Sequence, residues 1–202
     1  MKLCYIVGAG DFCGGFTPSE DDLVIAADGG YDALIKNGIR CDLLIGDLDS
    51  ITTPPKDIPL IKHPVRKDET DMHLCFNEGL ARGYTEFCIF GGTGGRDDHT
   101  FANYSLLLNI KNQGCNAVLY GANSATRVIK NEKIELVGEK GKHFSAFAFG
   151  GIAKGVYIRG LEYEADGIEL TPDFALAVSN IFTDKAASIS VDDGALLIMT
   201  EL

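Results

Sequence analysis

The sequence has no tryptophan, no Cys-x-x-C pair and no apolar run long enough to span a membrane. Its six cysteines are scattered, and several lie in apolar stretches. We therefore expect reduced thiols in a cytoplasmic protein, with neither a disulfide framework nor a zinc site. The first residues, 1–8, are too soon broken by glycine to form a signal peptide. The absence of a G-x-x-x-x-G-K-[ST] motif argues against a P-loop kinase.

Basic residues are few relative to acidic ones. The 202 residues include 18 Lys and Arg against 29 Asp and Glu, a net charge of −11. Nucleic-acid phosphates need basic patches, so this balance argues against DNA or RNA as a partner. It suits a cationic ligand, or an anionic ligand that arrives with its metal. A hydrophobic content of 46% with 23% charged residues is typical of a soluble globular protein.

Hydrophobic patterning divides the chain into two domains. Residues 1–121 alternate strands and helices, which predicts a mostly parallel α/β sheet. Residues 122–202 show short alternating runs separated by glycine-containing turns, which predicts an antiparallel β-sandwich. Its strands are expected at 126–130, 133–137, 143–149, 156–159, 175–178, 187–191 and 195–200. In the first domain we expect strands at 2–7, 23–27, 43–45, 85–90 and 117–120, and helices at 31–37, opening at 67–71, and at 100–111. The helix that opens at 67–71 has an apolar stripe at helical spacing, made of Met72, Cys75, Phe76 and Leu80.

Two aspartates, Asp47 and Asp49, follow the apolar run 43–45 in the stretch Gly46–Ser50. In an extended segment, side chains two residues apart face the same way, so both carboxylates would face one site. Two such charges about 4 Å apart repel by roughly 4 kcal/mol at a surface-like dielectric. Mg²⁺ would relieve that repulsion, and it suits a site with few carboxylates and substrate phosphates. A solvated turn is the alternative interpretation.

Other acidic residues also lie at strand ends or helix starts. Asp28 follows the strand expected at 23–27 and could either contact a ligand or cap the next helix. Asp68 and Asp71 open another helix, where they could bind a metal or simply favour the helix dipole.

A glycine-rich stretch, 91–99, follows the strand expected at 85–90. Gly91, Gly92, Gly94 and Gly95 can bring backbone N–H groups close to phosphate, and Arg96 offers a planar fork for its oxygens. Asp97 or Asp98 could be the helix N-cap. Ligands of open α/β sheets bind outside the carboxyl ends of the strands, so these motifs predict metal-assisted chemistry on a polyphosphate.

Taken together, the motifs resemble the thiamine pyrophosphokinase family. The resemblance is carried by 27–30, 46–50, 68–71 and 91–99, and in the second half by 160–163 and 179–182, so it covers nearly the whole chain. It implies an α/β catalytic domain, a thiamine-binding and dimerising β-sandwich, and a homodimer with thiamine between the catalytic domain of one subunit and the sandwich of the other. The implied reaction converts ATP and thiamine into thiamine diphosphate and AMP.

The resemblance also implies residue roles, carried over motif by motif. Asp47, Asp49 and Asp68 would hold Mg²⁺ with Asp71 beside them, and Arg96 would face phosphate. Asp98 would contact thiamine, and Ser179 and Asn180 would reach it from the sandwich. Asp28 and the loop 91–95 would line the ATP side. The resemblance does not settle the general base, for which Asp71 and Asp98 are our candidates. The sequence departs from the family pattern at Ala177 and Ile181, and any ring stacking on thiamine must use Phe or Tyr.

Two other functions are compatible with parts of the pattern. Acidic motifs at strand ends, with Asp98-His99, are also found in phosphoesterases of the Asp-His-His type. That chemistry needs histidine among its metal ligands, and this chain has one histidine near the acids. A non-catalytic nucleotide or thiamine sensor on the same fold is the third reading, and the intact acidic set argues against it.

Overall fold

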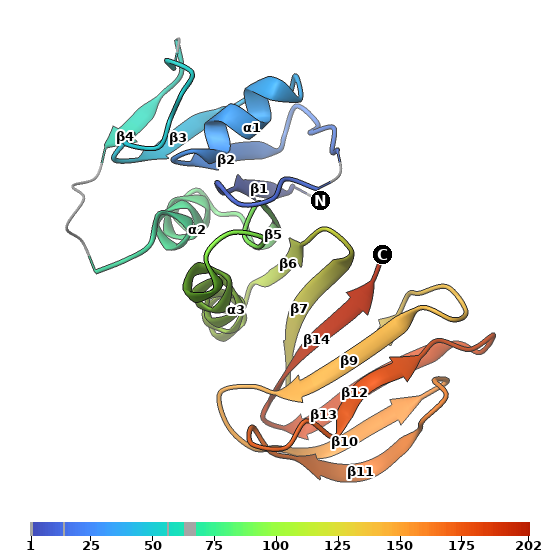
Figure 1. Ribbon diagram of the computed structural model, residues 1–202. Helices are drawn as coiled ribbons and strands as arrows, with labels where there is room; N and C mark the ends of the chain where they lie inside the picture. The colour runs from blue at the N-terminus through green and yellow to red at the C-terminus, as the bar shows by residue number, and fades with distance from the viewer. Residues whose placement is uncertain (1, 14, 56, 63–67) are drawn as a thin grey trace. The chain divides into compact units, whose positions relative to one another are not determined.

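A computed structural model describes residues 2–13, 15–55, 57–62 and 68–202 (Figure 1). The chain forms two compact units, one made of residues 1–106 with 113–122 and the other of residues 107–112 with 123–202. The end of the helix at Asp97–Asn112 therefore groups with the second unit. The predicted class, an α/β domain followed by an antiparallel β domain, is confirmed.

The first unit contains a parallel sheet whose strand order is β6-β5-β1-β2-β3-β4. Every pairing between neighbours is parallel. Five of the six strands were predicted, and β1, β2 and β3 are apolar runs that are buried along their whole length. The short strand β4 was not predicted, since its side chains are largely exposed. The strands are β1 (Cys4–Val7), β2 (Leu23–Ala27), β3 (Leu43–Gly46), β4 (Leu60–Lys62), β5 (Glu86–Phe90) and β6 (Asn116–Tyr120).

Helices cover both faces of this sheet, and Figure 1 shows α1 (Gly30–Lys36) and α2 (Asp71–Ala81) on opposite sides. Tyr31 and Leu34 of α1 pack in a cluster with Val24, because alternate strand residues point to the same face. On the other face, Gly79 of α2 lies so close to Cys4 that a side chain there would collide with its sulfur. The predicted apolar stripe of α2 is buried at Met72, Cys75 and Phe76.

The order of strands changes direction at β1. The chain builds β2, β3 and β4 on one side of β1 and then returns to place β5 and β6 on the other. The loops that follow β1 and β5 pair through three backbone hydrogen bonds of 2.8 Å each, from Gly8 N to Phe90 O, Gly10 N to Gly91 O and Asp11 N to Thr93 O. Such a switch point, at the carboxyl ends of the strands, is where open α/β sheets bind ligands.

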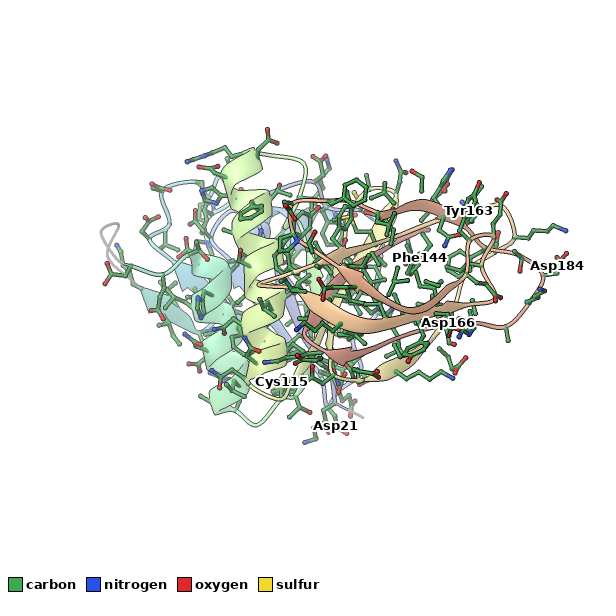
Figure 2. All side chains as sticks on the ribbon, turned by 90° about the horizontal axis from the view of Figure 1, so that it is seen from below. Asp21, Cys115, Phe144, Tyr163, Asp166 and Asp184 are labelled. Carbon is green, nitrogen blue, oxygen red and sulfur yellow. The ribbon has the colours of Figure 1, made fainter. Side chains whose placement is uncertain are left out.

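The second unit is a sandwich of two antiparallel sheets, ordered β12-β9-β14-β7 and β11-β10-β13-β8. Its core comes from inward residues of both sheets, and Figure 2 labels the fully buried Phe144 among them. Strand β11 was not predicted, because glycine and exposed residues obscure its alternation. The strands are β7 (Ser124–Lys130), β8 (Lys133–Leu136), β9 (His143–Ala148), β10 (Ala153–Arg159), β11 (Ala165–Leu170), β12 (Ala177–Ile181), β13 (Ala187–Asp193) and β14 (Ala195–Glu201).

Two expectations from composition can be compared with this fold. The structure joins none of the six cysteines in a disulfide. Burial raises the pKa of Cys4 to about 12, which keeps that thiol protonated and unreactive. In the part of the chain that the structure describes, no helix is long and apolar enough to cross a bilayer.

Candidate active site

Asp28 anchors the turn that follows β3. The residue lies directly after β2 with a positive φ of 45°, and its side chain is buried. Its carboxylate accepts hydrogen bonds from Leu48 N at 3.1 Å and from the Ser50 hydroxyl. The N-cap of α1 is Gly29, which makes no side-chain cap. The alternative role of Asp28 as a helix cap is therefore wrong, because its carboxylate is directed to the neighbouring strand end.

Asp47 and Asp49 converge through a turn. We expected an extended segment, and that expectation is wrong, because Leu48 has a φ of 71° and Asp49 N donates to Asp47 Oδ1 at 3.2 Å. The convergence itself is present. One carboxylate oxygen from each of Asp28, Asp47 and Asp49 lies within 4.8 Å of the others. This group is called the acidic triad below.

Charge repulsion within the acidic triad raises the pKa of Asp49 above its ordinary value. The charge of Asp47 is the largest cause, followed by lost hydration and the charge of Asp28, and Asp71 at the start of α2 adds a smaller effect. A cation between these oxygens would remove the repulsion, and hard carboxylate oxygens are the donors that Mg²⁺ prefers. The residues present therefore fit a magnesium ion. Asp68 lies outside the triad.

The glycine loop 91–95 packs closely against the segment that follows β1. Gly91 has a φ of 61°, and a side chain on it would collide with Gly8 O. Gly94 has a φ of 79° and lies against the carboxylate of Asp11. Asn103, a buried residue that sequence reasoning missed, donates from Nδ2 to Gly92 O at 2.7 Å. The loop is thus fixed at the same sheet edge as the acidic triad, after β5, which is separated from β2 by β1.

We expect Gly91→Ala and Gly95→Ala to differ sharply in stability. The positive φ at Gly91 alone costs a side chain about 1–3 kcal/mol, and the overlap with Gly8 O adds to that cost. A side chain at Gly95 would meet open space. Urea unfolding should show a clearly lower midpoint for Gly91→Ala and a near-normal one for Gly95→Ala. Equal midpoints would mean that the loop is not braced against the segment after β1.

Arg96 and Asp98 form a forked ion pair on the surface at the start of α3 (Asp97–Asn112). Arg96 Nη2 lies 2.5 Å from Asp98 Oδ2, and Nε lies 3.1 Å from Oδ1. Arg96 lowers the pKa of Asp98, and Asp98 raises the pKa of Arg96. Asp98 is therefore a weak proton acceptor. Because both side chains are largely exposed, a phosphate group can reach the guanidinium without displacing buried contacts.

Ser179 and Asn180 lie at an irregularity in the edge strand β12, where its register with β9 shifts. Ser179 has a φ of 58° and an exposed side chain, so its hydroxyl can meet a ligand. Asn180 is only 4% exposed, and its amide is used within the sandwich. Asn180 Nδ2 donates to Tyr163 O at 2.7 Å, and its Oδ1 accepts from Tyr163 N and Ile181 N. Asn180 therefore fixes the backbone at Tyr163, in the loop between β10 and β11, which is called the Tyr163 loop.

Removal of this amide should destabilise the sandwich. We expect Asn180→Ala to lower the free energy of unfolding by about 1–3 kcal/mol, because backbone groups of Tyr163 and Ile181 lose their partners. Chemical denaturation of the full chain measures this loss. Ser179→Ala is the matched control and should leave the midpoint nearly unchanged. A stable Asn180→Ala variant would show that the Tyr163 loop does not depend on the amide.

The fold and the site together define the class of protein. The parallel sheet presents an acidic triad, a braced glycine loop and an exposed arginine at its carboxyl edge. This set of groups is suited to transferring a phosphoryl-type group. The thiamin pyrophosphokinase catalytic domain matches residues 18–119, and the thiamin pyrophosphokinase vitamin B1 binding domain matches residues 127–196. The chain belongs to the thiamin pyrophosphokinase family, whose enzymes transfer pyrophosphate from ATP to thiamine.

Individual relatives agree with this assignment. The chain is similar to the thiamine pyrophosphokinase of Bacillus subtilis (strain 168), at 26% identity over 192 residues that cover 92% of this chain and 89% of that protein. The crystal structure of the Bacillus subtilis protein has the same fold, with a TM-score of 0.89, 23% identity and coverage of 100% and 99% of the two chains. The yeast thiamin pyrophosphokinase structure gives a TM-score of 0.71 at 16% identity, with coverage of 100% and 86%.

Proposed function

We propose that this chain transfers the pyrophosphoryl group of ATP to the hydroxyl of thiamine in a Mg²⁺-dependent reaction that yields thiamine diphosphate and AMP. The observation that carries the metal dependence is the convergence of Asp28, Asp47 and Asp49 within 4.8 Å at the carboxyl edge of the sheet. Membership of the family supports ATP and thiamine as the two substrates, and the site has groups suited to binding the metal and the polyphosphate.

The acidic triad would hold Mg²⁺ directly. Asp68 and Asp71, at the start of α2, would reach the ion through its waters, since Mg²⁺ usually keeps several of them. When bound, the ion neutralises charge on the phosphates of ATP. This assignment adds Asp28 to the ligands expected from the sequence, because its buried carboxylate lies beside those of Asp47 and Asp49.

The remaining groups orient the reactants. The loop 91–95 and Arg96 would bind the phosphates, and Asp98 would attract the cationic thiazolium ring of thiamine. The thiamine oxygen forms a bond to the β-phosphorus while the bond from that phosphorus to the AMP oxygen breaks, and AMP leaves with the electron pair. Asp71 would accept the hydroxyl proton. Asp98 is the weaker candidate for that step, because Arg96 lowers its pKa.

The proposed homodimer would use the edge strand β12. Apolar side chains two residues apart are exposed just before and at the start of β12, with Phe174 at 65%, Leu176 at 54% and Val178 at 42%. They lead directly into Ser179, which also has an exposed side chain. A second copy of the chain would cover this apolar row, and exposed apolar edge strands are rarely left uncovered in native proteins. The covering copy would then bring Ser179 of one subunit to thiamine held by the other.

Mixed dimers test this shared site. We expect Asp98→Ala and Ser179→Arg to be nearly inactive on their own at thiamine concentrations well below the raised KM, because each impairs a different side of the thiamine site. After subunit exchange, mixed dimers contain one intact site, so activity should recover to about a quarter of the wild-type level. Mixing two preparations of the same variant is the control. Failure to recover, with exchange verified by mass spectrometry, would argue against a site shared between subunits.

The reaction itself is tested by ³¹P NMR of ATP incubated with the protein. We expect AMP and a new diphosphate ester that form only when thiamine and Mg²⁺ are both present. Phosphate release that is independent of thiamine would favour the phosphoesterase. Binding of thiamine or nucleotide without turnover would favour the sensor.

A further inference from the structure

Asp32 is an acidic side chain that the proposed chemistry does not use. It lies in the first turn of α1, four residues after Asp28. Its Oδ2 accepts hydrogen bonds from Thr52 N and Thr52 Oγ1, both at 2.8 Å, and its Oδ1 accepts from Thr53 N at 2.8 Å. Thr52 and Thr53 belong to the segment that follows Gly46–Ser50. One carboxylate of α1 therefore holds the chain just beyond the turn that carries Asp47 and Asp49.

The turn is consequently anchored at two places. Asp28 binds Leu48 N and the Ser50 hydroxyl, and Asp32 binds the two threonines that follow. Leu48 adopts a φ of 71°, which a branched side chain adopts only when its surroundings enforce it. Asp49 is exposed, so the position of its carboxylate depends on the backbone that carries it. Loss of the second anchor would let the turn relax toward an ordinary backbone conformation.

Asp32 is well suited to this task electrostatically. Hydrogen bonds from Thr52 and Thr53 lower its pKa to about 2, the Thr52 backbone N–H being the largest cause. The carboxylate is therefore ionised and able to accept all of these hydrogen bonds at neutral pH. An acid in a first helical turn is usually explained by the helix dipole, which is why the sequence alone did not single it out.

We propose that Asp32 is a positioning residue for the metal site, one that fixes the turn so that Asp47 and Asp49 meet Asp28. This inference rests on the proposed function, because it concerns the metal of the same site. A merely structural Asp32 would lower stability without changing metal affinity, whereas a positioning residue changes metal affinity beyond any loss of stability.

Affinity for Mn²⁺, measured on the full chain by EPR of the free ion, separates these roles. The variants are Asp32→Ala, Asp32→Asn and Asp49→Ala. Asp22→Ala is the matched control, because the Asp22 carboxylate accepts from two backbone N–H groups, of Leu3 at 2.9 Å and Ser19 at 2.8 Å. Asp22 precedes β2, so it lies at the opposite end of that strand from Asp28. Asp32→Asn preserves the side-chain shape, and thus keeps the test informative if the alanine variant folds poorly.

We expect Asp32→Ala to weaken Mn²⁺ binding by about 10-fold or more, and Asp22→Ala to leave it within about twofold of the wild type. Asp32→Asn should be intermediate, because its amide can accept from Thr52 but presents an NH₂ group to Thr53 N. Equal affinities for Asp32→Ala and Asp22→Ala, with Asp49→Ala impaired, would overturn the positioning role alone. Equal affinities for wild type and Asp49→Ala would overturn the metal assignment itself, and this inference with it.

Discussion

Asp49→Ala is expected to abolish pyrophosphoryl transfer while leaving the fold intact. The exposed Asp49 carboxylate completes the acidic triad, so its removal leaves the proposed ion with two protein carboxylates from the triad. Loss of a group that stabilises charge in the transition state typically lowers turnover by about 10²–10³-fold, and loss of the metal itself costs more. Stability should hold, because the charge of Asp47 raises the pKa of Asp49 and the substitution removes that repulsion.

Steady-state assays across a range of Mg²⁺ concentrations, paired with thermal unfolding, measure both effects. Asp21→Ala is a suitable control, since Asp21 is also an exposed aspartate but precedes β2 (Figure 2). It should retain wild-type turnover. Near-normal activity of Asp49→Ala at low Mg²⁺ would show that the triad does not carry the chemistry.

Arg96→Ala is expected to lower kcat/KM for ATP by about 10²-fold, because the guanidinium is an exposed cation directly after the glycine loop. Arg96→Lys should recover only part of this loss. A lysine carries the charge but lacks the planar fork that binds two phosphate oxygens at once. The forked contact that Arg96 makes with Asp98, at 2.5 and 3.1 Å, shows that its guanidinium can present this geometry.

Asp98→Ala separates the two members of the ion pair. It removes the partner of Arg96 but leaves the guanidinium in place, so the KM for ATP should stay the same or fall. The KM for thiamine should rise, because the proposed contact with the thiazolium ring is lost. Kinetics with ATP and thiamine varied in turn resolve these effects.

For the Arg96→Ala prediction, full activity at low ATP would exclude Arg96 from phosphate binding.

The sequence predicted the fold well where burial dictates the pattern. The central strands are apolar throughout because they are covered on both faces, and α2 shows its buried stripe at Met72, Cys75 and Phe76. Strands β4 and β11 escaped prediction, since both are short or largely exposed and lack a clear alternation. The pattern of apolar and polar residues cannot reveal such strands, because they are held in the sheet by pairing with neighbouring strands and not by burial of their own side chains.

For the site, the sequence predicted that Asp47 and Asp49 would converge, but it did not predict the backbone conformation that brings them together. Asp47 and Asp49 meet through a turn with a positive φ at Leu48, and a sequence gives little sign that leucine will adopt it. The roles of Asn103, Asn180 and Asp32 depend on hydrogen bonds to segments distant in the sequence. Those partners become visible only when the strands are in register, so residue type alone could not reveal them.

The proposed reaction requires the acidic triad to hold the divalent ion that binds the polyphosphate. Anomalous diffraction from crystals grown with Mn²⁺ and a non-hydrolysable ATP analogue tests it most directly. We predict an anomalous peak about 2.1 Å from carboxylate oxygens of Asp47 and Asp49, close to Asp28, and in contact with a phosphate of the analogue. An analogue bound with its metal elsewhere in the chain, and no peak at the triad, would contradict it.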